Sequence, residues 1–202
     1  MGAKITIVGM YQKVKDIPNT TIIDTTSKSG TWSGLSPFNL GPCTDKNGQT
    51  ALNFENFWQY LKVYKRDVDM NNNPTPEYYE WMKAGFNNPK ACRYPMGRGA
   101  KPQYSLWHNN GQELHLGYIE ARKAIYAPYY AKLVQATESY KKLEQLYHTE
   151  SHLILRDYDG YDHDKLGLSL TQVLNNPARK MGHAFVLKML LTNDTALQEF
   201  NY

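Results

Sequence analysis

A carboxylate with aromatic neighbours stands in the first half of the sequence. Glu55, Gln59 and Lys62 are separated by four and three residues, which places them on one face of a helix. The side chains beside Glu55 are bulky and aromatic: Phe54, Phe57 and Trp58. Such surroundings withdraw a carboxylate from water, raise its pKa and strengthen its electrostatic effect on a bound ligand. The alternative is an exposed acidic residue in a first helical turn, which stabilises the helix dipole.

A second candidate is the segment 97–107, in which two glycines surround cationic residues. Glycine lets the backbone approach a ligand closely. Arg98 suits a phosphate group through its planar fork, and Lys101 suits it as a point charge. Trp107 offers a ring on which a base could stack. The alternative is a surface loop with ordinary cations and a tryptophan that belongs to the core.

Four aspartates and one histidine lie within the segment 157–164. A calcium loop needs oxygen ligands at alternate positions, but the EF-hand pattern fails because the twelfth position holds no glutamate and the central glycine is displaced. We therefore expect no metal ion. Asp159, or else Asp157, is instead a candidate carboxylate at the mouth of a cleft. The alternative is a turn with solvated acidic side chains.

The segment 175–183 is predicted to open a helix at residue 176. Helix N-termini present free N–H groups and partial positive charge, so they bind anions. Arg179 and Lys180 oppose the charge preference of a first helical turn, which suggests that they serve a ligand phosphate. An ordinary capped helix with two surface cations is the alternative.

The composition is that of a globular protein, with 41% hydrophobic and 21% charged residues among 202. The 16 tyrosines suggest a core that borders polar clefts, because each ring packs while its hydroxyl needs a partner. The net charge of +4 fits either a solvated basic surface or a phosphate site. No long basic block occurs, so nucleic-acid binding would need cations assembled in three dimensions.

Cys43 and Cys92 form no metal or redox pattern, and no signal peptide or long apolar run is found. These features predict a cytoplasmic protein without a membrane partner.

The spacing of apolar residues predicts four helical segments, at residues 53–68, 76–84, 116–147 and 176–191. Short strands are predicted at 5–8, 20–25 and 153–155, and loops at 27–48 and 87–110. Asn53 is the expected cap of the first helix, and Pro128 should interrupt the third. The sequence thus favours a mainly α fold with a few short β-strands, of the α+β class, as a single domain over residues 1–202.

Taken in order, these segments resemble the NADAR superfamily, which includes the N-glycosidase associated with riboflavin biosynthesis. The similar stretches are residues 35–38, 55–62, 97–107, 121–123, 157–162 and 179–189. The sequence departs from the family in two places. The family's tryptophan in the acidic segment is absent, with Tyr158 or Tyr161 nearest, and an insertion covers about residues 69–90.

The resemblance implies a cofactor-free hydrolase that cleaves an N-glycosidic bond between a base or amine and ribose. The family's substrates include phosphorylated riboflavin intermediates and ADP-ribosylated guanine in nucleic acid. Two other classes stay open: a non-catalytic module that binds ADP-ribose or a related nucleotide, and a protein acting on modified bases in DNA or RNA.

The candidate residues can be assigned roles in such a reaction. Glu55 would stabilise oxocarbenium-like charge on the sugar, with Asp159 or Asp157 as the second carboxylate. The expected binding residues for phosphate and base are Arg98, Lys101, Trp107, Trp58, Gln59, Lys62, Arg179 and Lys180.

Overall fold

The computed structural model describes residues 2–15, 18–109 and 111–200. The strands are β1 Lys4–Gly9, β2 Thr20–Asp24, β3 Cys43–Thr44, β4 Thr50–Ala51, β5 Lys62–Val63, β6 Tyr104–Asn109, β7 Gln112–Leu116 and β8 His152–Asp157. The α-helices are α1 Phe54–Tyr60, α2 Pro76–Phe86, α3 Tyr118–Ala121, α4 Ala127–Gln135, α5 Glu138–Thr149, α6 Leu170–Leu174 and α7 His183–Thr192. Short 3-10 helices cover Gly30–Leu35, Lys65–Asp67 and Thr195–Glu199, and a π-helical turn covers Arg122–Tyr126.

The prediction of a mainly helical chain is wrong, because the structure is a mixed α+β fold with 39% helix and 18% strand. The described residues form three sheets, with strand orders β1-β8-β2, β3-β4 and β5-β6-β7. Five of the eight described strands were not predicted. Strands β3 and β6 lie in predicted loops, β5 lies in a predicted helix, and β4 and most of β7 lie where no element was predicted. Strand β7 is largely polar and half-exposed, so it lacks the apolar alternation by which a strand is recognised.

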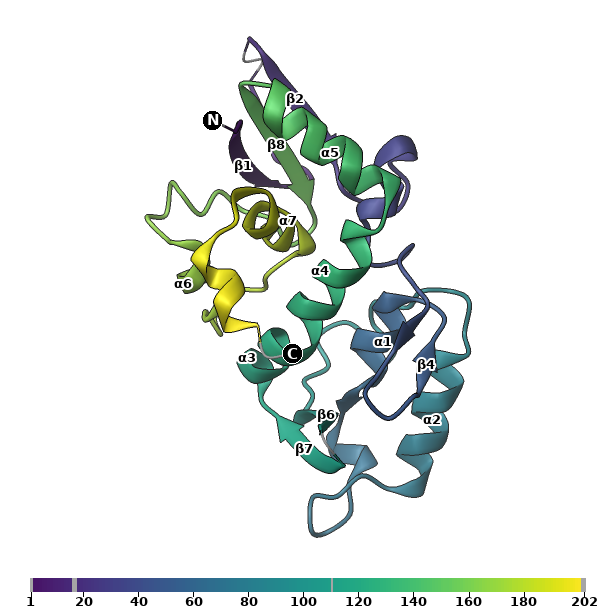
Figure 1. Cartoon of the computed structure of the whole chain (residues 1–202). Coiled ribbons are helices and arrows are strands. Elements are labelled where there is room, and N and C mark those ends of the chain that lie inside the picture. Colours follow the sequence, from purple (N-terminus) through teal and green to yellow (C-terminus); the bar gives the residue numbers. More distant parts are fainter. Residues whose placement is uncertain (1, 16–17, 110, 201–202) are drawn as a thin grey trace.

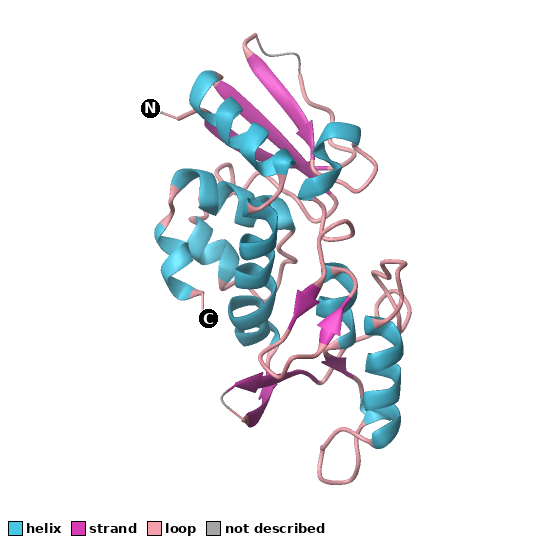
Figure 2. Cartoon of the chain, turned by 45° about the vertical axis from the view of Figure 1, so that its right-hand side comes forward, coloured by secondary structure: helices cyan, strands magenta, loops and turns pink. Residues whose placement is uncertain are grey.

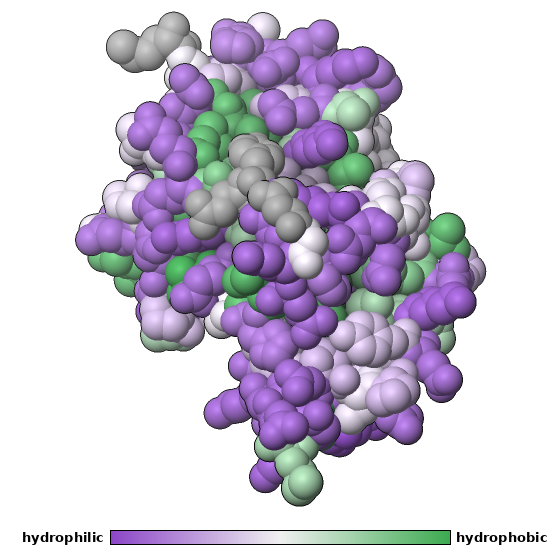
Figure 3. Space-filling model, turned by 60° about the horizontal axis from the view of Figure 1, so that its bottom comes forward, coloured by the Kyte–Doolittle hydropathy of each residue, from purple (hydrophilic) through white to green (hydrophobic). Residues whose placement is uncertain are grey.

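The elements are arranged in two groups joined by helices (Figures 1 and 2). The sheet β1-β8-β2 and α5 lie at one end, and α1, α2, β4 and β6 lie at the other, with α4 between them. Hydrophilic side chains cover most of the face shown in Figure 3, where hydrophobic atoms appear in small separate patches. Within the described ranges, no helix is both long and apolar enough to pass through a bilayer.

The sheet β1-β8-β2 confirms the strands predicted at 5–8, 20–25 and 153–155. Strand β8 lies in the middle and pairs in parallel with both neighbours. Its central residues Leu153, Ile154 and Leu155 are buried, as expected for a parallel strand covered on both faces. Because all three strands run in the same direction, the loops after β2 and β8 meet at one edge. Ligands of open parallel sheets commonly bind at this edge.

Helix α1 begins where predicted but is shorter. Asn53 caps it, with its Oδ1 accepting a hydrogen bond from the Asn56 N–H at 2.9 Å. The helix ends at Tyr60 instead of residue 68, because the Leu61 and Val63 carbonyls accept hydrogen bonds from the chain around β6 at 2.7 and 2.8 Å. Lys62 therefore lies on β5 and not on the helix.

The predicted long helix over 116–147 is divided into α3, the π-helical turn, α4 and α5, and its first residue, Leu116, instead ends β7. The expected interruption near Pro128 takes the form of this π-helical turn, which ends just before the proline. Proline cannot donate a backbone hydrogen bond, so the regular α-helical pattern is interrupted near it. Short π-helical turns within helices are frequent at functional sites. Along this helical stretch Tyr118, Arg122 and Tyr126 are spaced by four residues and share one face.

Asn56, on α1 next to Glu55, fixes the segment that follows α2. Its side chain is fully buried, and its Nδ2 donates to the carbonyls of Asn88 and Lys90 at 2.9 and 3.1 Å. Its Oδ1 accepts from the Cys92 N–H at 2.8 Å. Together with Asn53, whose Nδ2 also donates to the Asn88 carbonyl at 3.2 Å, this amide holds the root of the segment that continues into the cavity described below.

Replacing this amide should destabilise the protein. We expect Asn56→Ala to lower the free energy of unfolding by about 2–4 kcal/mol, since a buried side chain loses three hydrogen bonds and the Cys92 N–H is left without its partner. Urea denaturation followed by circular dichroism measures the difference. Asn87→Ala is the matched control, because it removes one exposed hydrogen bond and should cost under about 1 kcal/mol. Equal effects of the two substitutions would contradict the role of Asn56.

Candidate functional site

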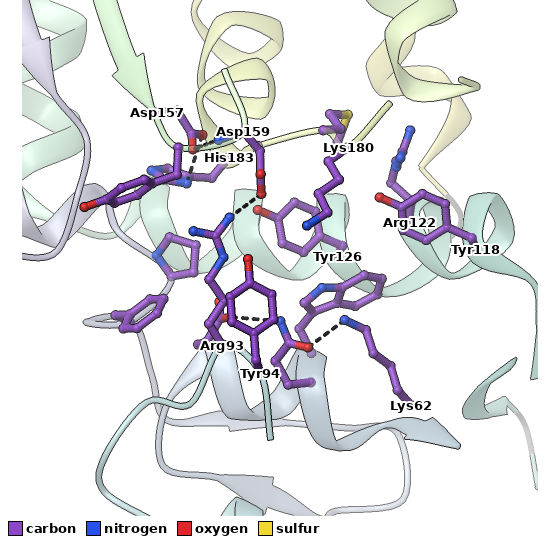
Figure 4. A pocket seen from close by; sticks show the side chains of 18 of the residues that line it. Lys62, Arg93, Tyr94, Tyr118, Arg122, Tyr126, Asp157, Asp159, Lys180 and His183 are labelled. Atoms are coloured by element: carbon purple, nitrogen blue, oxygen red, sulfur yellow. Dashed lines mark hydrogen bonds and ion pairs between the residues drawn. The ribbon is translucent and has the colours of Figure 1, made fainter. Parts of the chain in front are cut away.

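A cavity of about 730 Å³ lies between the carboxyl edge of the sheet β1-β8-β2 and helix α1 (Figure 4). This volume is within the range of small-molecule sites. Its walls come from seven parts of the chain: the loop after β2, residues 36–38, α1 with β5, residues 93–102, the face carrying Tyr118 and Tyr126, the loop after β8, and residues 177–183. Segments far apart in the sequence therefore meet around one hollow.

Glu55 lies in the wall of this cavity, as predicted, with 6% of its surface exposed. Its Oε1 accepts a hydrogen bond from Gln59 Nε2 at 2.9 Å, and Gln59 Oε1 accepts one from Lys62 Nζ at 2.7 Å. No described residue donates a hydrogen bond to Glu55 Oε2, and Oε2 is not completely buried. One carboxylate oxygen is thus held while the other can meet a ligand.

Burial changes the pKa of the two ionisable groups that Gln59 connects, Glu55 and Lys62. It raises the pKa of Glu55 above its ordinary value of 4.5, although the hydrogen bond from Gln59 and the charge of Lys62 oppose the rise. Burial lowers the pKa of Lys62 from 10.5 to about 8, although the charge of Glu55 opposes the fall. The Lys62 amine also lies 4.6 Å from the centre of the Trp58 ring. The charges of both groups therefore depend on pH, and that of Lys62 changes near pH 8.

Asp157 lines the cavity, but both of its oxygens are used within the protein. Its Oδ1 accepts from the Asp159 N–H at 3.1 Å, and its Oδ2 accepts from the Ala184 N–H at 3.0 Å. His183 Nδ1 lies 3.1 Å from the same Oδ2. Gly182 permits this approach, since a side chain there would collide with the carboxylate. These contacts favour Asp157 as the group that joins β8 to α7, and leave Asp159 as the second carboxylate.

Asp159 forms an ion pair with Arg93, a residue that the sequence analysis did not single out. Arg93 Nη2 donates to Asp159 Oδ2 at 2.5 Å. The guanidinium carbon of Arg93 also lies 5.5 Å from the ring centre of Tyr158. Figure 4 shows Arg93 reaching across the cavity toward Asp159. No local signal marks Arg93, because its partner is 66 residues away in the sequence.

Arg122 is a buried cation on the opposite wall, with 1% of its surface exposed. Its guanidinium donates to the carbonyls of Val173, Leu174, Asn176 and Arg179 at 3.0–3.2 Å. The Tyr118 ring centre lies 4.5 Å from its central carbon. Arg122 therefore fixes the segment that leads to Arg179 and Lys180. In the sequence, Arg122 stands out only as part of the stretch 121–123 that resembles the NADAR superfamily.

Most of the predicted binding residues do come together. Eight candidate residues besides Glu55 line the same cavity: Trp58, Gln59, Lys62, Lys101, Asp157, Asp159, Arg179 and Lys180. Arg98 is exposed near the rim, with its guanidinium 5.7 Å from the ring centre of Tyr94, which lines the cavity. Tyr126 also lines the cavity, and its ring centre lies 5.1 Å from that of Trp58.

The assignment of Trp107 to base stacking is corrected. Trp107 is only 3% exposed, because it is packed on Phe57 and Tyr129 with ring centres at 6.3 and 5.4 Å. It borders a separate small hollow and not the main cavity. It is thus the core tryptophan of the alternative interpretation.

The helix N-terminus predicted at residue 176 is corrected as well. Residues 175–182 form turns and extended backbone, and α7 begins only at His183. The first N–H groups of α7 include that of Ala184, which is bonded to Asp157. Arg179 and Lys180 reach the cavity from a loop, so their charge and not a helix end would attract an anion.

The cavity concentrates positive charge. Seven cationic side chains line it: Lys28, Lys62, Arg93, Lys101, Arg122, Arg179 and Lys180. Three carboxylates oppose them: Glu55, Asp157 and Asp159. The formal excess of four equals the net charge of the whole chain. The charge of these walls therefore suits an anionic ligand.

A family model described as a family of unknown function, DUF6939, matches residues 9–173. The chain belongs to this family. No curated protein and no solved structure matches the chain. Among the described residues, no group of three or more His, Cys, Asp or Glu side chains is placed to hold a metal ion.

The burial of Glu55 should cost stability when the carboxylate is ionised. Because its pKa in the folded state is raised above 4.5, stability is lost as the pH rises from about that value through the folded-state pKa. A glutamine cannot ionise. We therefore expect Glu55→Gln to be more stable than the wild type at pH 7.5, with a smaller difference at pH 4.

Thermal unfolding of both proteins across this pH range measures the effect. Glu144→Gln is the control, since Glu144 is exposed on α5. A Glu55→Gln protein that is less stable than the wild type at pH 7.5 would show that the charged form is favoured by the fold.

Proposed function

We propose that this protein hydrolyses an N-glycosidic bond between a base or amine and ribose in a phosphorylated ribose compound. The observation that carries the proposal is the buried Glu55 carboxylate, with one oxygen held by Gln59 and the other open to a cationic cavity. The ordered resemblance to the NADAR superfamily supports the same chemistry. The matched family is of unknown function, so the contacts within the cavity are the main support for this activity.

Cleavage of the C1′–N bond places positive charge on the sugar ring in the transition state. A carboxylate beside C1′ stabilises this charge, and it does so more strongly where water is excluded. Glu55 has this environment, and the hydrogen bond from Gln59 keeps its orientation fixed before the substrate binds. A water molecule adds its oxygen to C1′, and its proton is transferred to the leaving nitrogen, so that the products are a free base or amine and a ribose compound.

The rest of the cavity would bind the two ends of the substrate. Lys62, Lys101, Arg179 and Lys180 supply positive charge for phosphate oxygens. Trp58 and Tyr126 supply aromatic surface near Glu55, which is the role that Trp107 cannot fill. Asp159 is the candidate to accept a proton from the attacking water once it is released from Arg93.

The direct test is to incubate the protein with ADP-ribosylated guanine DNA, NAD and aminopyrimidine ribosyl phosphates, and to look for a released base or amine by chromatography. Release from any of them supports the proposal and identifies the leaving group. Binding without release would instead indicate a non-catalytic nucleotide-binding module.

Removing the charge of Glu55 should remove turnover. We expect Glu55→Gln to lower kcat by about 10²–10³-fold with KM nearly unchanged, because the amide keeps the shape of the carboxyl group but not its charge. Steady-state kinetics on the substrate found above measures this. Glu144→Gln, on the exposed face of α5, should keep wild-type rates. Turnover of Glu55→Gln within about tenfold of the wild type would remove Glu55 from the centre of the mechanism.

The amine of Lys62 predicts how substrate binding depends on pH. Because its pKa is lowered to about 8, the amine loses its charge as the pH rises through 8, and KM for a phosphorylated substrate should increase there. Lys62→Arg should keep a low KM at pH 9.5, since a guanidinium stays charged. Measuring KM from pH 6 to 9.5 for both proteins tests this. The same rise of KM in the arginine variant would assign it to another group.

A further inference from the structure

Two consecutive residues of segment 87–103, Arg93 and Tyr94, contact the cavity wall that carries Asp159 and Lys180. Arg93 donates to Asp159, as described above. The Tyr94 ring centre lies 5.6 Å from Lys180 Nζ. Figure 4 shows both side chains on the same side of the cavity, below Asp159 and Lys180. The root of this segment is held by Asn56, so the pair projects from a fixed base.

Three cations lie within 6 Å of the ring centre of Tyr94. The guanidinium carbons of Arg93 and Arg98 lie 5.4 and 5.7 Å from its centre, and Lys180 Nζ lies at 5.6 Å. Of these three cations, only Arg93 has a carboxylate partner. Arg98 and Lys180 form no ion pair with any residue in the described part of the chain. Like charges gathered at one place repel each other. Contact with the half-buried ring of Tyr94 offsets part of this repulsion, and an added anion would offset the rest.

The ion pair between Arg93 and Asp159 is open to exchange. The two side chains are 26% and 28% exposed, and ion pairs with such access to water are weak. A phosphate dianion carries more charge than a carboxylate and presents oxygens to several donors at once. It would contact Arg93 and also neutralise Arg98 and Lys180, which Asp159 does not.

We propose that Arg93, Arg98 and Lys180 form a binding site for a phosphate-type dianion, and that the dianion replaces Asp159 as the partner of Arg93. Binding thereby frees a carboxylate that lines the same cavity as Glu55. The inference deepens the proposed function, and its consequence for catalysis rests on that function. The binding step does not, because it needs no turnover.

The experiment uses inorganic phosphate and pyrophosphate as probes on the full chain, with affinities from isothermal titration calorimetry at constant ionic strength. Arg93→Ala should weaken binding of the probe. Asp159→Asn should strengthen it by about fivefold or more, because the competing carboxylate is gone. In the double variant the gain from Asp159→Asn should vanish, since Arg93 is no longer there to be released.

Two comparisons separate exchange at Arg93 from a general change of charge. Glu55→Gln removes a negative charge from the same cavity without removing the partner of Arg93, so it should strengthen binding less than Asp159→Asn. Lys83→Ala removes an exposed cation on α2, outside the cavity lining, and should leave the affinity unchanged. Arg93→Gln replaces Arg93→Ala if the smaller side chain lowers the unfolding temperature.

Two results would overturn the proposal. One is that the wild type does not bind the probe, or that it binds the probe equally well after Arg93 is replaced. The other is a gain from Asp159→Asn that is missing, or that persists in the absence of Arg93. Because these outcomes concern binding of a simple ion, they are independent of whether any N-glycosidic bond is cleaved.

Discussion

A carboxylate loses favourable hydration when it is buried, and the surroundings of Glu55 show how the chain offsets that loss. Gln59 donates to one oxygen, and Lys62 donates to Gln59 in turn. The amide therefore has its nitrogen toward the acid and its oxygen toward the base, an orientation that the two charges dictate. Lys62 lies over Trp58, which favours its cationic form while the surrounding burial opposes it. The balance leaves one oxygen of Glu55 free on the cavity side.

This arrangement works only if two distant parts of the fold are held at a fixed separation. On one side, Asp157 joins the end of β8 to the start of α7, and His183 Nε2 donates to the Thr25 carbonyl after β2 at 2.9 Å. On the other side, Asn53 and Asn56 hold α1 to the segment after α2. The hydrogen bonds of the first network are buried, and those of the second are made by the buried side chains Asn53 and Asn56. The polar walls are thus joined to the core by specific hydrogen bonds.

The sequence predicts the parts of the site that depend on local spacing. Glu55, Gln59 and Lys62 do meet, although Lys62 does so from a strand, because the helix ends at Tyr60. Arg179 and Lys180 do reach the cavity, although no helix begins at residue 176. In both cases the residue types correctly predicted which side chains reach the cavity, but the predicted secondary structure was wrong. Pairing with β6 overrode the helical periodicity after Tyr60.

What the sequence could not show depends on contacts between distant residues. Arg93 is chosen by Asp159, and Arg122 by carbonyl groups 51–57 residues further along the chain. Neither partner set leaves a local pattern. Trp107 shows the opposite difficulty, because its neighbours in the sequence suggested a ligand while its neighbours in space are Phe57 and Tyr129. A tryptophan serves the core and a binding site equally well, so residue type alone does not decide between them.

The position of Asn56 directly after Glu55 links the buried carboxylate to the chain that follows α2. Segment 69–90 comes after the 3-10 helix Lys65–Asp67, forms α2 and returns to Asn56 at Asn88. Helix α2 is fixed by the buried residues Tyr78, Met82 and Phe86, whereas residues 70–73 form an exposed turn before it. No residue of this segment lines the cavity, so an insertion in the exposed turn should leave the carboxylate in place, which makes the turn a suitable point for attaching a label.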